Sequence, residues 1–254
     1  MKQIPNFFTL LNLVFGCLAI VAILQNGLVF SPDQDGKQWI DIPPQIWMAS
    51  LFIGLAALVD FLDGFLARAL KADSEMGKQL DSLADVVSFG VAPAMILYQF
   101  LRLSFAQQED GLNISTWLLA PVFILPAAAA YRLARFNLDT STSYGFKGMP
   151  VPAAGIFVAS LPLIYWNVDQ PWVGPLMKNY WFIYGITILL SWLMVSRLPL
   201  MALKFRDYSF ANNKEKYSLV ILALLLVFLL KWLAIPAIIL AYVVLSLLFQ
   251  KKQA

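Results

Sequence analysis

The chain has 254 residues, of which 60% are hydrophobic and 13% are charged, and its mean hydropathy is +0.72. Soluble domains are typically about 45–50% apolar and about 25% charged, so this composition excludes an ordinary soluble domain and predicts an all-α, polytopic membrane helix bundle. The net charge of +3 is too small to indicate nucleic-acid binding. The chain has no histidine and one cysteine, Cys17, which excludes an imidazole base, a His-ligated zinc and an intrachain disulfide. Any acid–base or metal chemistry therefore falls to carboxylates.

Eight apolar segments approach the roughly 20 residues that a membrane helix requires. In chain order the predicted spans are 7–30, 46–69, 79–104, 116–136, 153–166, 178–197, 217–232 and 235–249. We expect the last two to form a tight hairpin around Ala234-Ile235-Pro236, because 217–249 is too long for a single crossing. A proline kink within one long helix is the alternative.

Lysine and arginine are distributed unevenly over the two ends of these spans. Fourteen of the 18 lie on the side that holds both termini, and four lie on the other side: Lys37, Arg102, Lys178 and Lys231. Because cytoplasmic loops carry the excess of positive charge, we expect a multi-pass protein of the cytoplasmic membrane with both termini in the cytoplasm. The loop 31–45 is then outside, and the connection 198–216 is expected along the cytoplasmic interface.

Acidic residues are concentrated in one stretch of the apolar sequence, DFLDGFLARALKADSEMGKQLDSLAD, from Asp60 to Asp85. In a helix, Asp60 and Asp63 share one face, and Asp81 and Asp85 share another. A short turn around 71–75 would make the two helices antiparallel, so that four carboxylates face one another near the cytoplasmic surface. Four negative charges at low dielectric need cations, and all-oxygen ligation favours Mg²⁺ or Mn²⁺.

The residues between these acids favour a phosphate-bearing ligand. Gly64 and Gly77 lie on the acidic faces and leave room for a ligand, while Arg68 offers a positive fork suited to phosphate. The alternative is simple ion pairing of Asp60 or Asp63 with Arg68 at a helix end. One arginine cannot neutralise four aspartates, so we favour a site.

The acidic stretch resembles the signature of the CDP-alcohol phosphotransferase family of integral membrane enzymes. The matching pattern has eight residue types at fixed spacings: Asp60-x2-Asp63-Gly64-x2-Ala67-Arg68-x8-Gly77-x3-Asp81-x3-Asp85. The resemblance implies a six-helix catalytic core, placed here in residues 1–205, with two additional C-terminal helices in residues 206–254. It also implies transfer of a phosphatidyl-type group from a CDP-linked lipid to an alcohol, with release of CMP.

The resemblance also implies roles for individual residues. Asp60, Asp63 and Asp81 would be metal ligands, and Asp85 would complete a site for two divalent ions and serve as the general base. The residue spacing alone leaves open which of the four acids is the base. The CDP-lipid would contact Asn6, Thr9, Gly64, Ala67, Arg68 and Gly77. Asn6 is equally well explained as part of a helix start.

Two further stretches resemble the serine-using branch of this family. The first, VVSFGVAPA, follows Asp85, although helix packing around a kink at Pro93 also explains part of it. The second consists of YRLARFN and FKGMPVP, and it supplies the expected acceptor-binding residues Arg132, Arg135, Asn137 and Lys147. Arginine suits the carboxylate of serine, whereas positive-inside anchoring is the alternative for the arginine pair. Lys147 is equally well explained as an anchor to anionic lipid.

The expected substrates are therefore CDP-diacylglycerol and L-serine, in a setting of membrane lipids and without nucleic acid. Dimers are common in the family that the chain resembles, but no residue pattern here identifies an interface. The nearest alternative is the same chemistry with inositol phosphate, glycerol phosphate or choline. A cation or proton transporter is a second alternative, but its acids would be distributed across the membrane, whereas these lie within about three helical turns of one edge. A non-catalytic scaffold would have to retain four costly carboxylates.

Overall fold

The computed structural model describes residues 4–32, 38–70, 74–108, 111–138, 146–201 and 213–250 as a bundle of helices with two small antiparallel hairpin sheets. Five helical stretches in these ranges are long and apolar enough to cross a membrane: Pro5–Gln25, Pro44–Leu70, Glu75–Ala106, Thr116–Leu138 and Lys216–Phe249. The predicted all-α polytopic membrane fold is confirmed. The interfacial position expected for 198–216 falls largely on residues outside the described ranges.

The elements of the N-terminal half are α1 (Ile4–Gln25), β1 (Val29–Pro32), β2 (Gln38–Asp41), η1 (Pro44–Ile46), α2 (Trp47–Leu70), α3 (Glu75–Asp85), the π-helical turn η2 (Val86–Val91) and α4 (Ala92–Ala106). Those of the C-terminal half are η3 (Gly111–Asn113), α5 (Thr116–Leu119), η4 (Ala120–Phe123), α6 (Ile124–Leu138), β3 (Phe146–Lys147), α7 (Val151–Asn167), α8 (Val173–Met177), α9 (Tyr180–Val195), β4 (Pro199–Leu200), α10 (Lys214–Leu230), η5 (Lys231–Leu233) and α11 (Ala234–Gln250). Each of the eight predicted spans overlaps a helix of this order.

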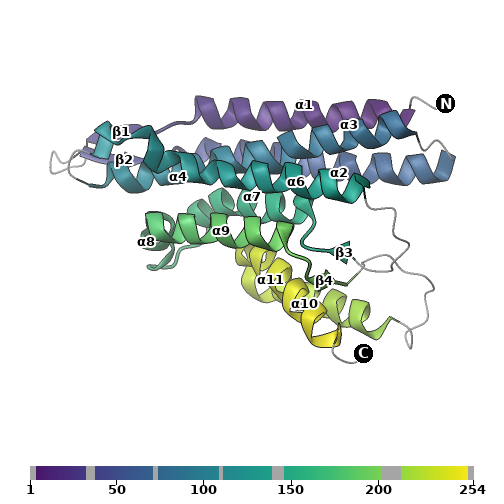
Figure 1. Cartoon of the computed structure of the whole chain (residues 1–254). Helices are drawn as coiled ribbons and strands as arrows, with labels where there is room; N and C mark the ends of the chain where they lie inside the picture. Colours follow the sequence, from purple (N-terminus) through teal and green to yellow (C-terminus); the bar gives the residue numbers. More distant parts are fainter. Residues whose placement is uncertain are drawn as a thin grey trace.

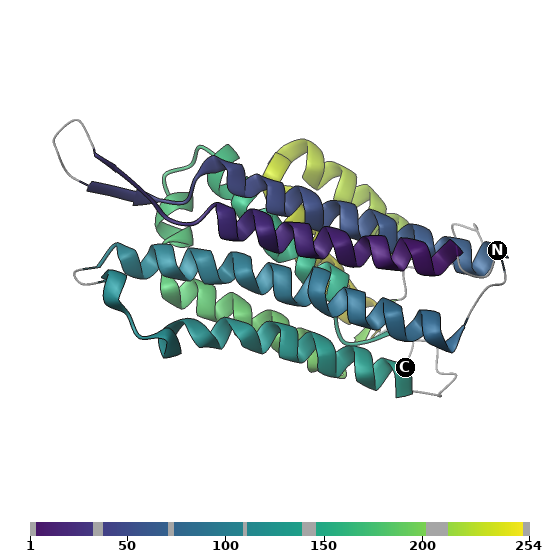
Figure 2. The same ribbon diagram turned by 90° about the horizontal axis from the view of Figure 1, so that it is seen from above.

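The two ends of the bundle differ in structure. Helix α1 begins, and helices α2 and α6 end, at one end, while β1, β2 and α8 lie at the other (Figure 1). Viewed from above, β1 and β2 project beyond that second end (Figure 2). Asp41 joins β2 to the helices at this end, because it accepts a hydrogen bond from Tyr165 of α7 at 2.5 Å and forms an ion pair with Lys178 at 3.5 Å.

The first predicted span, 7–30, is wrong at its C-terminal end. Helix α1 stops at Gln25, and Val29 already belongs to β1, which pairs antiparallel with β2. The amide of Asn26 donates to the carbonyl of Ala22 at 2.7 Å and so satisfies a group of the last helical turn. Hydropathy extended the prediction through the apolar residues that follow, although the Asn26-Gly27 pair is typical of a helix end.

The last two helices form the predicted hairpin, three residues earlier than expected. The chain turns at Lys231–Leu233, where Lys231 has a φ of 49°, and α11 then packs against α10. Ala234 and Pro236 belong to the first turn of α11, where the missing N–H of proline has no intrahelical partner to lose.

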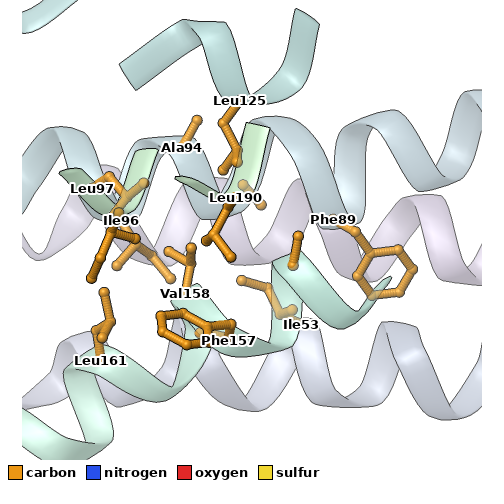
Figure 3. Close-up of a cluster of buried hydrophobic side chains, with 14 of the residues drawn as sticks. Ile53, Phe89, Ala94, Ile96, Leu97, Leu125, Phe157, Val158, Leu161 and Leu190 are labelled. Carbon is orange, nitrogen blue, oxygen red and sulfur yellow. The ribbon is translucent and has the colours of Figure 1, made fainter. Parts of the chain in front are cut away.

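The buried core lies between the helices of the first and second halves. Ile53 of α2, Leu97 of α4, Leu125 of α6, Val158 of α7 and Leu190 of α9 meet there (Figure 3). Large apolar side chains also cover the outside of the bundle, as in a protein surrounded by lipid; they include Phe61, Trp117, Trp181 and Phe228.

A π-helical turn interrupts the long helix immediately after Asp85. Pro93 has no N–H to continue the regular ladder, and the N–H of Ala92 donates to the carbonyl of Val87, five residues back. Pro93 therefore does not simply kink this helix, as expected, but follows a change in its hydrogen-bond register.

Three glycines bring neighbouring helices close to this π-turn. A Cβ on Gly16 of α1 would lie 2.9 Å from Ser88 Cα, and one on Gly155 of α7 would lie 2.8 Å from Phe89 Cβ. A Cβ on Gly90 of the turn itself would lie 3.2 Å from Pro126 Cα of α6. The first two separations leave no room for a methyl group and the third is tighter than an ordinary contact, so α1, α6 and α7 together fix the segment that follows Asp85.

Candidate active site

The four motif aspartates meet at the end of the bundle where α2 ends and α3 begins. One carboxylate oxygen from each of Asp60, Asp63 and Asp81 lies within 4.8 Å of the others. Asp85 interacts electrostatically with all three of these carboxylates. Asp63 and Asp85 are each only 5% exposed. Helical spacing therefore brings the acids together as the sequence predicts, and their mutual repulsion at low dielectric requires positive charge nearby.

These residues fit a hard divalent cation. The donors are carboxylate oxygens alone, three of them converge, and no histidine or cysteine competes among them. Oxygen-only, multiply charged sets of this kind suit Mg²⁺ or Mn²⁺ better than softer metals.

Two side chains of α1 hold the carboxylates in place. The hydroxyl of Thr9 donates to Asp63 Oδ2 at 2.7 Å, and the amide of Asn12 donates to Asp85 Oδ1 at 3.3 Å. Metal-ligating carboxylates commonly have such hydrogen-bond donors behind them. Asn12 was not among the predicted site residues. Its position three residues after Thr9, on the same face of α1, is the signal that could have identified it.

A cavity of about 480 Å³ opens beside the acidic cluster. All six residues predicted for the CDP-lipid line it, and they are Asn6, Thr9, Gly64, Ala67, Arg68 and Gly77. Asp63, Asp81 and Lys78 also contribute to its wall, and Lys78 is a cation that the sequence interpretation missed. The volume is in the range of pockets that hold small-molecule ligands.

The two glycines of the cavity act differently. A Cβ on Gly77 would lie 2.9 Å from Asn6 Oδ1, so glycine allows the start of α3 to approach the start of α1. A Cβ on Gly64 would meet only Arg68 Nη1, at 3.7 Å, so glycine here leaves the wall open. The sequence predicted that both glycines leave space for a ligand, and this holds for Gly64 but not for Gly77, where the space is taken by Asn6.

The structure separates the two arginines predicted for the acceptor. Arg132 is 7% exposed and interacts electrostatically with Asp85 and with Tyr242 of α11. Arg135 instead donates to the backbone carbonyls of Val195, at 2.8 Å, and Ser196, at 3.2 Å, where α9 ends. Arg132 is thus the member of the pair that is brought to the acidic cluster.

The other two predicted acceptor residues lie farther along the chain. The amide of Asn137 donates to Ser82 Oγ at 2.8 Å, and its backbone carbonyl accepts from Lys78 Nζ at 3.1 Å, which joins α6 to α3. Lys147 belongs to β3, where its backbone is paired with Pro199 of β4.

The fold and the site define a polytopic membrane protein with a buried cluster of carboxylates beside a ligand-sized cavity. Residues 2–195 match the model of the family described as CDP-alcohol phosphatidyltransferase, and the chain belongs to this family. Proteins of this family generally depend on divalent cations. The matched region ends with α9, so the α10–α11 hairpin lies outside it.

The curated relatives carry closely related names. The chain is 35% identical over 187 residues to a CDP-diacylglycerol–serine O-phosphatidyltransferase of Helicobacter pylori (strain J99), covering 73% of this chain and 70% of that protein. It is 34% identical over 170 residues to the protein of that name from Bacillus subtilis (strain 168), covering 65% of this chain and 78% of the relative. An archaetidylserine synthase of Methanothermobacter thermautotrophicus is 33% identical over 162 residues, covering 63% and 58% of the two chains.

Proposed function

We propose that this protein transfers the phosphatidyl group of CDP-diacylglycerol to the hydroxyl of L-serine, forming phosphatidylserine and releasing CMP. The observation that carries this proposal is the convergence of Asp60, Asp63 and Asp81 beside the cavity, with Asp85 in electrostatic interaction with them, in a chain of this family. The names of the relatives from H. pylori and B. subtilis support serine as the acceptor alcohol.

Asp60, Asp63 and Asp81 would hold Mg²⁺ or Mn²⁺, with Asp85 completing a site for two ions. When bound, the ions supply positive charge that stabilises the pyrophosphate and the departing CMP. Thr9 keeps the Asp63 carboxylate oriented through its hydrogen bond. Arg68 and Lys78 add cationic groups to the cavity wall, where they would bind phosphate oxygens.

Asp85 would act as the general base. The serine hydroxyl oxygen attacks the lipid-side phosphorus, its proton passes to the Asp85 carboxylate, and the bond from that phosphorus to the CMP oxygen breaks. Burial and the hydrogen bond from Asn12 fix the position of this carboxylate. A proton acceptor held within the cluster meets the requirement for activating an alcohol without histidine.

Arg132 would bind the carboxylate of serine, because its buried guanidinium lies near Asp85. Arg135 and Asn137, whose polar groups bond to the end of α9 and to α3, would contribute to the packing of α6 in the bundle. Lys147, a residue of β3, would be a further acceptor-binding residue.

We place the protein in the cell membrane with both termini and the site on the cytoplasmic side. The distribution of lysine and arginine over the predicted spans supports this orientation. Residues 1–205 would form the catalytic unit and residues 206–254 would add the C-terminal helix pair. A homodimer stays a prediction.

CMP release from CDP-diacylglycerol by purified protein in detergent tests the function. Serine, inositol phosphate, glycerol phosphate and choline are offered separately, each with Mg²⁺ or Mn²⁺. We expect metal-dependent release with serine, lost in Asp85→Asn and kept in Asp169→Asn, which changes an exposed acid between α7 and α8. Release with another alcohol would overturn the choice of serine, and no release with any acceptor from folded protein would favour the transporter.

A further inference from the structure

Two residues that interact with Asp85, Asn12 and Arg132, each have a buried polar atom without a hydrogen-bond partner. In the part of the chain that the structure describes, four buried side-chain atoms are in this state, namely Asn12 Oδ1, Ser50 Oγ, Arg132 Nε and Ser191 Oγ. Buried polar atoms are nearly always paired, so each exception requires an explanation, and a bound ligand is one. Two of the four belong to residues that contact or electrostatically engage Asp85.

The orientation of the Asn12 side chain is set by its neighbours. Asn12 is fully buried, and an ionised Asp85 can only accept hydrogen bonds, so the NH₂ group of the amide faces Asp85 and the oxygen faces away from that bond. The backbone carbonyl of Asn12 accepts from Ser88 Oγ at 3.0 Å, which holds this turn of α1 against the π-turn. Asn12 Oδ1 is therefore a fixed, unpaired acceptor next to the base.

Arg132, which interacts electrostatically with Asp85, provides an unpaired donor where Asn12 provides an unpaired acceptor. Its guanidinium can only donate, and its Nε has no acceptor among the described residues. It comes from α6, whereas Asn12 comes from α1, so the two groups approach Asp85 from different helices. A buried guanidinium is suited to a planar carboxylate.

We propose that Asn12 and Arg132 form a recognition site for the zwitterion of an α-amino acid. The ammonium group donates to Asn12 Oδ1, the carboxylate accepts from Arg132 Nε, and the side-chain hydroxyl lies toward Asp85. This assignment rests on the proposed function and deepens it. The unpaired acceptor Asn12 Oδ1 matches the ammonium group, and the unpaired donor Arg132 Nε matches the carboxylate, and simple alcohols have neither of these groups. The site thus selects hydroxy amino acids over alcohols that carry only one of these charges.

Three acceptors that differ by one group test the assignment. L-serine has both charges, L-glycerate lacks the ammonium group, and ethanolamine lacks the carboxylate. The measured quantity is kcat/KM for each acceptor at saturating CDP-diacylglycerol and metal. The variants are Asn12→Ala, the similarly sized Asn12→Leu and Arg132→Ala. Asn26→Ala is the matched control, since Asn26 is a buried asparagine at the far end of the same helix.

We expect Asn12→Ala and Asn12→Leu to lower kcat/KM about 10- to 100-fold more with serine than with glycerate, the range for hydrogen bonds to charged groups, because loss of the bond to Asp85 lowers the values for both acceptors alike. Arg132→Ala should lose about as much with serine and little with ethanolamine. Asn26→Ala should match wild type. L-alanine, which keeps both charges but has no hydroxyl, should inhibit competitively with serine, and its inhibition constant should rise in the same variants.

Equal losses with serine and glycerate in both Asn12 variants would mean that Asn12 only holds Asp85, and would overturn recognition of the ammonium group. Equal losses with serine and ethanolamine in Arg132→Ala would overturn recognition of the carboxylate. If neither Asn12 variant folds, absence of competition by L-alanine in wild type would overturn the assignment. Failure of the proposed function is distinguishable, because wild type would then release no CMP with serine.

Discussion

Replacing Thr9 with valine should weaken metal binding without disturbing the fold. Thr9 and Asp63 are both about nine-tenths or more buried, and the Thr9 hydroxyl lies 2.7 Å from Asp63 Oδ2. Valine has nearly the same shape as threonine, so the variant removes the hydroxyl, which lies 2.7 Å from Asp63 Oδ2 and 3.1 Å from the Pro5 carbonyl, and leaves the packing of α1 on α2 almost unchanged. The Asp63 carboxylate then loses the donor that orients it.

The size of the effect follows from the charge on the acceptor. A hydrogen bond to an ionised group contributes about 1.5–3 kcal/mol, and about 1.4 kcal/mol corresponds to a factor of ten in an equilibrium constant. Loss of hydrogen bonds behind metal ligands commonly costs about 10- to 100-fold in metal affinity or activity. We therefore expect the Mn²⁺ concentration for half-maximal activity to rise by about 10- to 100-fold in Thr9→Val.

The assay is CMP release as a function of Mn²⁺ concentration at saturating substrates. Thr187→Val is the matched control, because Thr187 is equally buried but donates to the carbonyl of Ile183 within α9. Its metal dependence should match wild type. A Thr9→Val curve that superimposes on those of wild type and the control would refute the idea that this hydrogen bond prepares the metal site.

Three further changes test the fold around the site. Gly155→Ala should lower stability by about 1–3 kcal/mol through overpacking against Phe89, which would be measured as a lower Tm in detergent. Gly54→Ala is the control and should leave Tm unchanged, because a Cβ on Gly54 would meet no atom within 4 Å. Tyr165→Phe removes the hydrogen bond to Asp41 and should lower stability by about 1–2 kcal/mol. The metal dependence of activity should not change, because this bond lies at the end of the bundle opposite the acidic cluster, and a changed metal dependence would contradict this. Arg135→Ala should lower Tm with a KM for serine within about threefold of wild type, because its donors bond to the end of α9; a larger rise in that KM would return Arg135 to the acceptor site.

The acidic cluster could be predicted because it depends on local geometry. Helical spacing puts Asp60 and Asp63 on one face and Asp81 and Asp85 on another, and the short connection between α2 and α3 makes the two faces meet. The same reasoning applies to the cavity residues, which lie on those faces or at the start of α1.

The parts that could not be predicted depend on contacts between distant segments. Asn12 reaches Asp85 only because α1 docks on the π-turn through Gly16 and Ser88. Spacing alone places Arg132 and Arg135 on one helix face, and it is the position where α9 ends that draws Arg135 away. The strand at Val29 was missed because apolar residues alone do not distinguish a helix from an extended segment.

The π-turn changes the rotation of α3 relative to α4 about the common axis of one membrane-spanning helix. Successive residues of an α-helix are 100° apart, and a π-helical turn contains about one residue more than an α-helix would use. The acidic face of α3 and the apolar face of α4 are therefore oriented independently within Glu75–Ala106. If Val86–Val91 formed regular α-helix with the same number of residues, Asp81 and Asp85 would rotate by about 100° relative to α4 and away from Asp60, whereas deletion of the one extra residue would restore regular helix and keep both orientations.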